Sequence, residues 1–197
     1  MEVVQLDLGD PDACLKFAEG YSKSNHVDIL VNNGGISQRD EFVNSDFCIA
    51  TRLMNVNTLS TIALTKGFLP QLIKLKDKGG SQIVNIASIA GQIGTGLRTF
   101  YCMSKFAQDG FGKALQAEVA HHNVHVVSCH PAYVKTNIAK FALVGDGKPM
   151  GKTDSNIGNG ISCEDAIDLL VKAMYLKRSW ICLAPVSEYY YTVYPRA

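Results

Sequence analysis

Five short apolar runs alternate with segments of helical pattern, and this alternation constrains the fold more than any other feature of the chain. The runs cover residues 3–8, 27–31, 82–88, 124–129 and 180–184. Helical patterns fill the intervals at about 11–22, 45–76 and 99–121, and another begins at about 163. Strands that alternate with helices are typical of α/β proteins with a parallel sheet. We therefore expect a parallel α/β fold.

Local signals mark several helix boundaries. Pro11 suits a first helical turn, where its missing N–H costs nothing, so a helix is expected to open there. Pro70 is expected to bend or interrupt the long helical stretch that ends near residue 76. Ser162 and Asp165 have the spacing of a capping box. The helix after this box is expected to turn four apolar side chains inward: Ile167, Leu170, Val171 and Met174.

Composition favours a single domain over residues 1–197. Of the 197 residues, 47% are hydrophobic and 19% are charged, which is enough to bury a sizeable core. The net charge of +1 gives no electrostatic case for nucleic-acid binding. No run of about 18 apolar residues indicates a membrane span. The cysteines lack CxxC spacing and the histidines lack matching carboxylates or thiolates, so no metal site is expected.

Three residues have the spacing of a proton-transfer site. Lys105 follows Tyr101 by four residues, so both side chains share one helix face, and Ser88 ends the apolar run before that helix. The pKa of a tyrosine is ordinarily about 10, and a nearby ammonium favours the phenolate and lowers that pKa. We therefore predict that Tyr101 exchanges a proton with an alcohol or carbonyl whose oxygen Ser88 also holds. The alternative is a tyrosine and a lysine that merely share a helix surface.

A second candidate ligand site follows the run at 27–31, where the sequence continues as NNGG over 32–35. Glycines after a parallel strand allow the backbone to approach a ligand closely. Ligands of open α/β sheets bind beyond the carboxyl ends of the strands. The alternative is a plain Asn/Gly turn.

Taken together, these motifs resemble the short-chain dehydrogenase/reductase (SDR) family. They occur in the family's order from about residue 2 to the end: Asp7, NNGG at 32–35, Asn57, Ser88, Tyr101, Lys105 and PAYVKT at 131–136. Within the family, the stretches at 27–39, 100–105 and 179–185 resemble a subgroup of membrane-associated enzymes of the endoplasmic reticulum. The implied fold is a Rossmann-like, doubly wound parallel sheet.

The resemblance implies a role for each matched residue. Tyr101 would be the general acid and base, Ser88 would orient the substrate oxygen, and Lys105 would bind the nicotinamide ribose. Asn57 would hold a water molecule that links Lys105 to solvent. The other matched residues would bind the cofactor: Asn33 and Gly34 along its length, Asp7 at the adenine, and Val134 and Thr136 at the nicotinamide carboxamide.

The implied reaction is reversible hydride transfer between a nicotinamide cofactor and a secondary alcohol or carbonyl. The resemblance favours NADP(H) over NAD(H), and a small lipophilic substrate such as a steroid or retinoid.

The resemblance also implies roles for larger segments of the chain. The helices at 45–76 and 99–121 would form a homodimer interface. The glycine-rich segment 137–160 would be a substrate lid, with a surface loop as the alternative. The aromatic tail at 189–194 could line the substrate mouth, contact a dimer partner or touch a membrane surface.

The same resemblance exposes a missing part. Family members begin with two strands and a TGxxxGxG loop that binds the cofactor pyrophosphate at a helix N-terminus, whereas this sequence begins at the third strand. We therefore expect an incomplete, N-terminally truncated SDR domain that lacks the anchor of its relatives and is soluble. Residues 27–31 would form an open apolar edge, and residues 3–8 would either slide beside them or lack a neighbour.

Two interpretations remain open for a chain of this kind. The first is an enzyme whose missing part belongs to a longer protein. The second is an inactive isoform that keeps the dimer helices and acts as an interaction protein.

Overall fold

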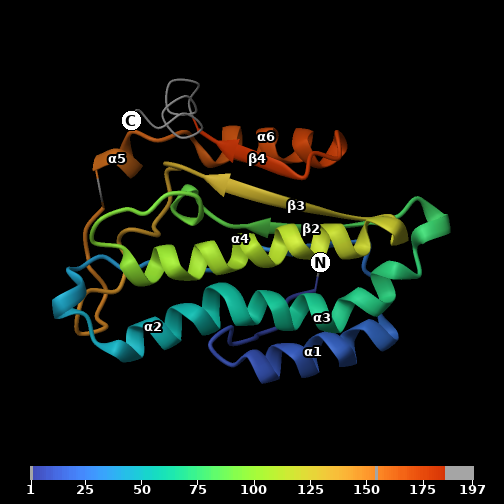
Figure 1. The fold of residues 1–197 in the computed structure, drawn as a ribbon, viewed down its shortest axis with the longest axis horizontal. Helices are drawn as coiled ribbons and strands as arrows, with labels where there is room; N and C mark the ends of the chain where they lie inside the picture. Colours follow the sequence, from blue (N-terminus) through green and yellow to red (C-terminus); the bar gives the residue numbers. More distant parts are fainter. Residues whose placement is uncertain (1, 154, 185–197) are drawn as a thin grey trace.

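A parallel four-stranded sheet forms the centre of the computed structural model, which describes residues 2–153 and 155–184 (Figure 1). Its strands are β1 (Ile29–Asn32), β2 (Ser81–Ile86), β3 (Val124–Pro131) and β4 (Trp180–Leu183), in that order across the sheet. Pairing in register places Val31 beside Val84, and Val84 beside Val127. The predicted α/β fold with a parallel sheet is confirmed.

Helices cover both faces of this sheet. Helices α3 (Ser60–Ile73) and α4 (Thr99–Val119) pack on one face, and α1 (Pro11–Ser24) packs outside α3. Helix α6 (Cys163–Tyr175) packs on the other side of β3 and β4. Side chains alternate along each strand, so β3 contributes Val126 to the core under α4 and Cys129 to the core under α6. Two cores on opposite faces are the arrangement of a doubly wound sheet.

The long helical stretch is interrupted at a place that the sequence did not indicate. Helix α2 (Phe47–Met54) passes into a π-helical turn at Asn55–Leu59, and α3 follows it. Pro70 lies inside α3 near its C-terminus, so it does not interrupt the helix, and the alternative that it bends the helix stays a prediction. Hydroxyls of the next turn bond to backbone carbonyls of the π turn: Ser60 Oγ donates to Val56 O (2.7 Å), and Thr61 Oγ1 donates to Asn57 O (3.2 Å). π turns of this kind occur frequently at functional sites.

The predicted strand at residues 3–8 does not form. Within the described residues, β1 is the edge of the sheet, and Ile29 and Val31 on it are each about half exposed (47% and 49%). Residues 3–8 therefore neither slide beside β1 as a strand nor gain another partner in the sheet. The predicted open apolar edge is confirmed.

Most predicted helix boundaries are also confirmed. Helix α1 begins at Pro11, with the Asp10 side chain accepting from Ala13 N at 3.0 Å. Helix α6 follows Ser162, whose Oγ accepts from Asp165 N at 3.0 Å.

The inward face of α6 differs from the prediction. Of the four residues predicted to face inward, Leu170 and Met174 are partly buried, whereas Ile167 and Val171 are more than half exposed. The buried residues are Ala166 and Ala173. The small residues allow α6 to approach the sheet closely, Ile167 and Leu170 border the cavity at the strand ends, and Val171 is on the exposed side.

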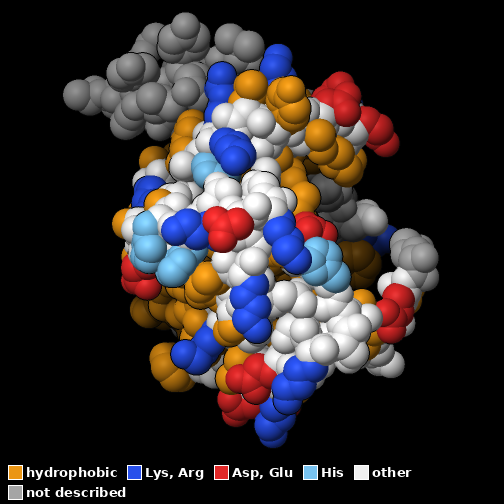
Figure 2. All heavy atoms as spheres, turned by 90° about the vertical axis from the view of Figure 1, so that its right-hand side faces the viewer, with side chains coloured by type: hydrophobic (Ala, Val, Ile, Leu, Met, Phe, Trp, Pro, Cys, Tyr) orange, Lys and Arg blue, Asp and Glu red, His pale blue; other side chains and the backbone are white. Residues whose placement is uncertain are grey.

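The end of the molecule at which the strands begin carries charges of both signs. Figure 2 shows Lys, Arg and His side chains there interspersed with Asp and Glu. This mixture agrees with a net charge of +1 over the sequence. Among the described helices, none is both long and apolar enough to span a bilayer.

Candidate active site

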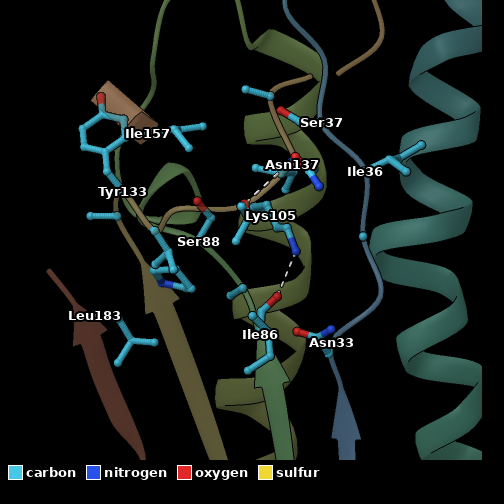
Figure 3. A pocket seen from close by; sticks show the side chains of 18 of the residues that line it. Asn33, Ile36, Ser37, Ile86, Ser88, Lys105, Tyr133, Asn137, Ile157 and Leu183 are labelled. Carbon is cyan, nitrogen blue, oxygen red and sulfur yellow. Dashed lines mark hydrogen bonds between the residues drawn. The ribbon is translucent and has the colours of Figure 1, made fainter. Parts of the chain in front are cut away.

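A cavity of about 660 Å³ lies beyond the carboxyl ends of the strands. Asn33 after β1, Ile86 at the end of β2 and Leu183 at the end of β4 all border it, so the cavity extends across the sheet (Figure 3). Seven of the residues singled out in the sequence line its wall: Asn33, Gly34, Ser88, Tyr101, Lys105, Val134 and Thr136. Residues far apart in the chain therefore meet at the edge of the sheet where ligands of α/β proteins bind.

Tyr101 and Ser88 form one part of this wall. Ser88 follows β2 and caps the short helical turn Ile89–Gly91, with its Oγ accepting from Ala90 N at 3.1 Å. Burial raises the pKa of Tyr101, and a hydrogen bond with Ser88 and the charge of Arg98 offset part of that rise. The prediction that this pKa is lowered is not met in this structure, because burial is the largest influence. A buried tyrosine of this kind keeps its proton at neutral pH and can donate it.

Lys105 is buried beside them on α4. Its Nζ donates to Ile86 O and to Gln108 Oε1, both at 2.9 Å. Burial lowers the pKa of this lysine to about 7. The ammonium is therefore only partly charged near neutral pH, and it donates to two carbonyl oxygens. For these reasons it is not a main influence on the pKa of Tyr101.

Asn57 lies behind the wall and is fully buried in the π turn. Its side chain accepts from Ile36 N at 2.8 Å and donates to Ile36 O and Ser104 Oγ, each at 2.9 Å. These bonds tie the loop after β1 to α4. The water molecule between Asn57 and Lys105 stays a prediction.

Glycines allow close approach of the backbone at this wall. A Cβ on Gly35 would lie 3.2 Å from Asn57 Oδ1 and 3.6 Å from Lys105 Nζ. A Cβ on Gly91 would lie 2.6 Å from Lys105 O. Gly34 is covered by the side chain of Leu8. The glycines at 34–35 therefore pack against the protein's own side chains. The fit for the nicotinamide half of a dinucleotide comes from the polar groups of Asn33, Lys105 and Thr136, which line the cavity.

Asp7 does not join this cavity. It is exposed, and its Oδ1 accepts from Gly9 N at 2.8 Å, which is ordinary turn chemistry. The predicted contact with adenine lies outside the cavity that the structure forms and stays a prediction.

The segment 137–160 borders the cavity from above the strand ends. Leu143 N donates to Ser37 O and Arg39 N donates to Leu143 O, both at 2.8 Å, which joins the segment to the loop after β1. Six of its residues line the cavity: Asn137, Ile138, Ala139, Phe141, Ala142 and Ile157. The aromatic tail at 189–194 lies outside the described residues.

Sequence reasoning missed two polar residues of the site. Gln108 contacts Lys105, and Ser104 contacts Asn57. Gln108 lies seven residues after Tyr101, so helical spacing alone could have placed it on the Tyr101–Lys105 face.

Comparisons with known proteins agree with this geometry. The model of the short chain dehydrogenase family matches residues 1–143. A dehydrogenase/reductase SDR family protein 7-like of Drosophila melanogaster is 32% identical over 94% of this chain and 56% of its own length. Dehydrogenase/reductase SDR family member 7B of Bos taurus is 34% identical over 92% of this chain and 55% of its own length. The chain thus spans little more than half the length of these curated relatives.

Solved structures share the fold at lower identity. A short-chain dehydrogenase from Streptomyces avermitilis superposes with a TM-score of 0.81 at 23% identity, over 98% of this chain and 74% of that one. A short-chain dehydrogenase from Sphingobium yanoikuyae in complex with NADPH gives a TM-score of 0.77 at 22% identity, over 92% and 66%. The family model, the curated relatives and the shared fold all indicate the same family as the sequence motifs that line the cavity. The names of the relatives, SDR family protein 7-like and member 7B, confirm a resemblance of stretches 27–39, 100–105 and 179–185 to SDR family member 7. The chain belongs to the short-chain dehydrogenase family.

Proposed function

We propose that the protein transfers hydride between a nicotinamide cofactor and a carbonyl or secondary alcohol of a small lipophilic substrate. One observation carries this proposal: Ser88, Tyr101 and Lys105 lie together on the wall of a single cavity. Apolar side chains provide much of the remaining wall, including Phe141, Ile157 and Leu183. Such a wall favours a lipophilic substrate, because polar groups without partners would be costly to bury there.

The protein's own residues supply the proton chemistry. Ser88 Oγ accepts from Ala90 N and shares a hydrogen bond with Tyr101, so a substrate oxygen between the two hydroxyls would take over the Ser88 proton. Tyr101 keeps its proton at neutral pH and donates it to that oxygen as negative charge develops. Lys105, fixed by two carbonyl acceptors, would bind the ribose hydroxyls. A bound nicotinamide would supply the hydride.

NADP(H) is the proposed cofactor, in preference to NAD(H). The resemblance to SDR family member 7 supports the preference for NADP(H). Asn33, Gly34, Val134 and Thr136 would hold the nicotinamide half, since all four line the same cavity as Lys105. A comparison of NADPH and NADH turnover by the natural full-length protein tests this preference, and equal or better turnover with NADH would refute it.

Tyr101→Phe tests the reaction itself. In the full-length protein, reduction of a lipophilic ketone should fall by about 10²-fold or more, because the proton donor is lost, while NADPH binding persists. Tyr133→Phe is a matched control, because Tyr133 lines the same cavity but its hydroxyl points away from Ser88 (Figure 3). Unchanged turnover in Tyr101→Phe would contradict the proposal.

A homodimer is proposed from the exposed apolar residues of α2 and α4, which pack against each other. Phe47, Met103 and Phe106 are exposed there at 80%, 41% and 45%. The alternative function, an inactive interaction protein, would use the same surface. Light scattering should give a dimer mass for the chain and a monomer mass for Phe106→Glu; a monomeric wild type at tens of micromolar would refute the dimer.

Association of the full-length protein with the endoplasmic reticulum is proposed from the subgroup resemblance alone. Cell fractionation tests it, and recovery of the protein outside the microsomal fraction would refute it.

A further inference from the structure

A buried glutamine lies directly behind Lys105. Gln108 stands one turn further along α4 and is 1% exposed. Both ends of its amide are bonded: Oε1 accepts from Lys105 Nζ at 2.9 Å, and Nε2 donates to Thr61 Oγ1 at 3.2 Å. Thr61 in turn donates to Asn57 O at 3.2 Å. A chain of side chains therefore joins Lys105 to the π turn.

The direction of every bond in this chain is fixed by chemistry. The Asn57 carbonyl can only accept, so the Thr61 hydroxyl must donate to it and is left as an acceptor for Gln108. The Gln108 amide must then present Nε2 to Thr61 and Oε1 to Lys105. Rotating the amide by half a turn would set two donors against each other at Lys105. Gln108 is thus held as a permanent acceptor at the ammonium.

An acceptor at this position matters because the surroundings of Lys105 contain little that favours a positive charge. Tyr101 on α4 and Cys129 on β3 both keep their protons near neutral pH, since burial raises the pKa of each. His130 on β3 is a buried histidine whose pKa is lowered by burial. Asp109 is paired with Lys113 at 2.6 Å. Arg39 of the loop after β1 and Arg98 line the same cavity and add positive charge, which does not favour the ammonium. Gly35 of that loop and Asn57 of the π turn, which lie closest to Lys105 Nζ, are uncharged, so carbonyl oxygens are the main partners of the ammonium.

We propose that Gln108 is a positioning residue, which holds the Lys105 ammonium at the cavity wall and favours its charged form through a bond fixed by Thr61 and Asn57. The inference rests on the proposed function only for its consequence in turnover. The contact itself exists in the chain without cofactor or substrate. A merely structural glutamine would fill space on α4 and leave the lysine titration unchanged.

The test is an NMR titration of Lys105 in the chain labelled with 13Cε-lysine. Gln108→Leu should lower the titration midpoint of Lys105 by about one pH unit, since a hydrogen bond to a charged group is lost. Gln108→Glu, which has nearly the same shape, should raise it by about one to three units, because it places a carboxylate beside the ammonium. Gln116→Leu is the control: Gln116 also bonds from α4, to Val126 N at 2.6 Å, and should leave the midpoint unchanged.

Coinciding midpoints in wild type and Gln108→Glu would overturn the inference, even where Gln108→Leu fails to fold. A second readout separates this inference from the proposed function. In the full-length protein, the pH profile of carbonyl reduction should shift in the same direction as the midpoint. Shifted midpoints with an unchanged profile would support the role of Gln108 and refute the role of Lys105 in turnover.

Discussion

Replacing Lys105 by methionine should remove a pH-dependent cost from the folded state. Burial lowers the pKa of Lys105 from 10.5 to about 7, so between these values the unfolded chain binds a proton that the folded chain does not. Stability therefore rises with pH across this window, and the rise from pH 7 to pH 9 contributed by Lys105 is about 2 kcal/mol. Below pH 7 both states are protonated and the cost is constant. Lys105→Met should lack this rise.

The change in unfolding free energy between pH 7 and pH 9 reports the Lys105 titration more specifically than the unfolding free energy at a single pH. At any single pH, Lys105→Met also leaves Ile86 O and Gln108 Oε1 without their donor, at about 1–3 kcal/mol each. That cost does not depend on pH in this window, so it cancels between pH 7 and pH 9. Other titrating groups are common to both proteins and cancel as well.

Urea unfolding at pH 7 and pH 9, followed by circular dichroism, measures the effect. Lys66→Met, at an exposed position on α3, is the matched control and should behave like wild type. An equal change in unfolding free energy between the two pH values in wild type and Lys105→Met would refute the reasoning.

Three further predictions concern residues around Lys105. Asn57→Ala should lower the free energy of unfolding by about 2–4 kcal/mol, because two buried backbone groups lose their partner; a loss below about 1 kcal/mol on urea unfolding would count against it. Gly91→Ala should cost about 1–3 kcal/mol through the contact with Lys105 O, whereas Gly94→Ala, in open space, serves as the neutral control; equal stability of the two variants would contradict the close approach. Burial raises the pKa of Cys129 to about 12, so a thiol reagent at pH 8 should modify the exposed Cys48 and leave Cys129 unmodified. Mass spectrometry that shows labelled Cys129 in the folded chain would disprove this prediction.

The sheet could be predicted from the sequence because its central strands, β2 and β3, are buried on both faces. Apolar runs at 82–88 and 124–129 lack the alternation of a half-exposed strand, and helices separate them. The meeting of Tyr101 and Lys105 at one cavity could be predicted because i, i+4 spacing places both side chains on a shared helix face. Both inferences depend only on the geometry of single elements.

Other features depend on contacts that no single element contains. The π turn at Asn55–Leu59 is held by tertiary bonds from Asn57 to the loop after β1 and to α4. The raised pKa of Tyr101 follows from burial by the whole fold. On α6, periodicity allowed two neighbouring faces, and close packing selected the one with the small residues Ala166 and Ala173.

The most direct test of the proposed activity is NADPH binding by this chain, followed by nicotinamide fluorescence with folding checked by circular dichroism. If Lys105 and the loop at 33–35 hold the nicotinamide half of the cofactor, wild type should bind NADPH saturably. Lys105→Ala should weaken that binding by about tenfold or more, and Lys66→Ala should not. A folded wild-type chain without saturable binding, or one in which Lys105→Ala binds equally well, would contradict the account and favour the interaction protein.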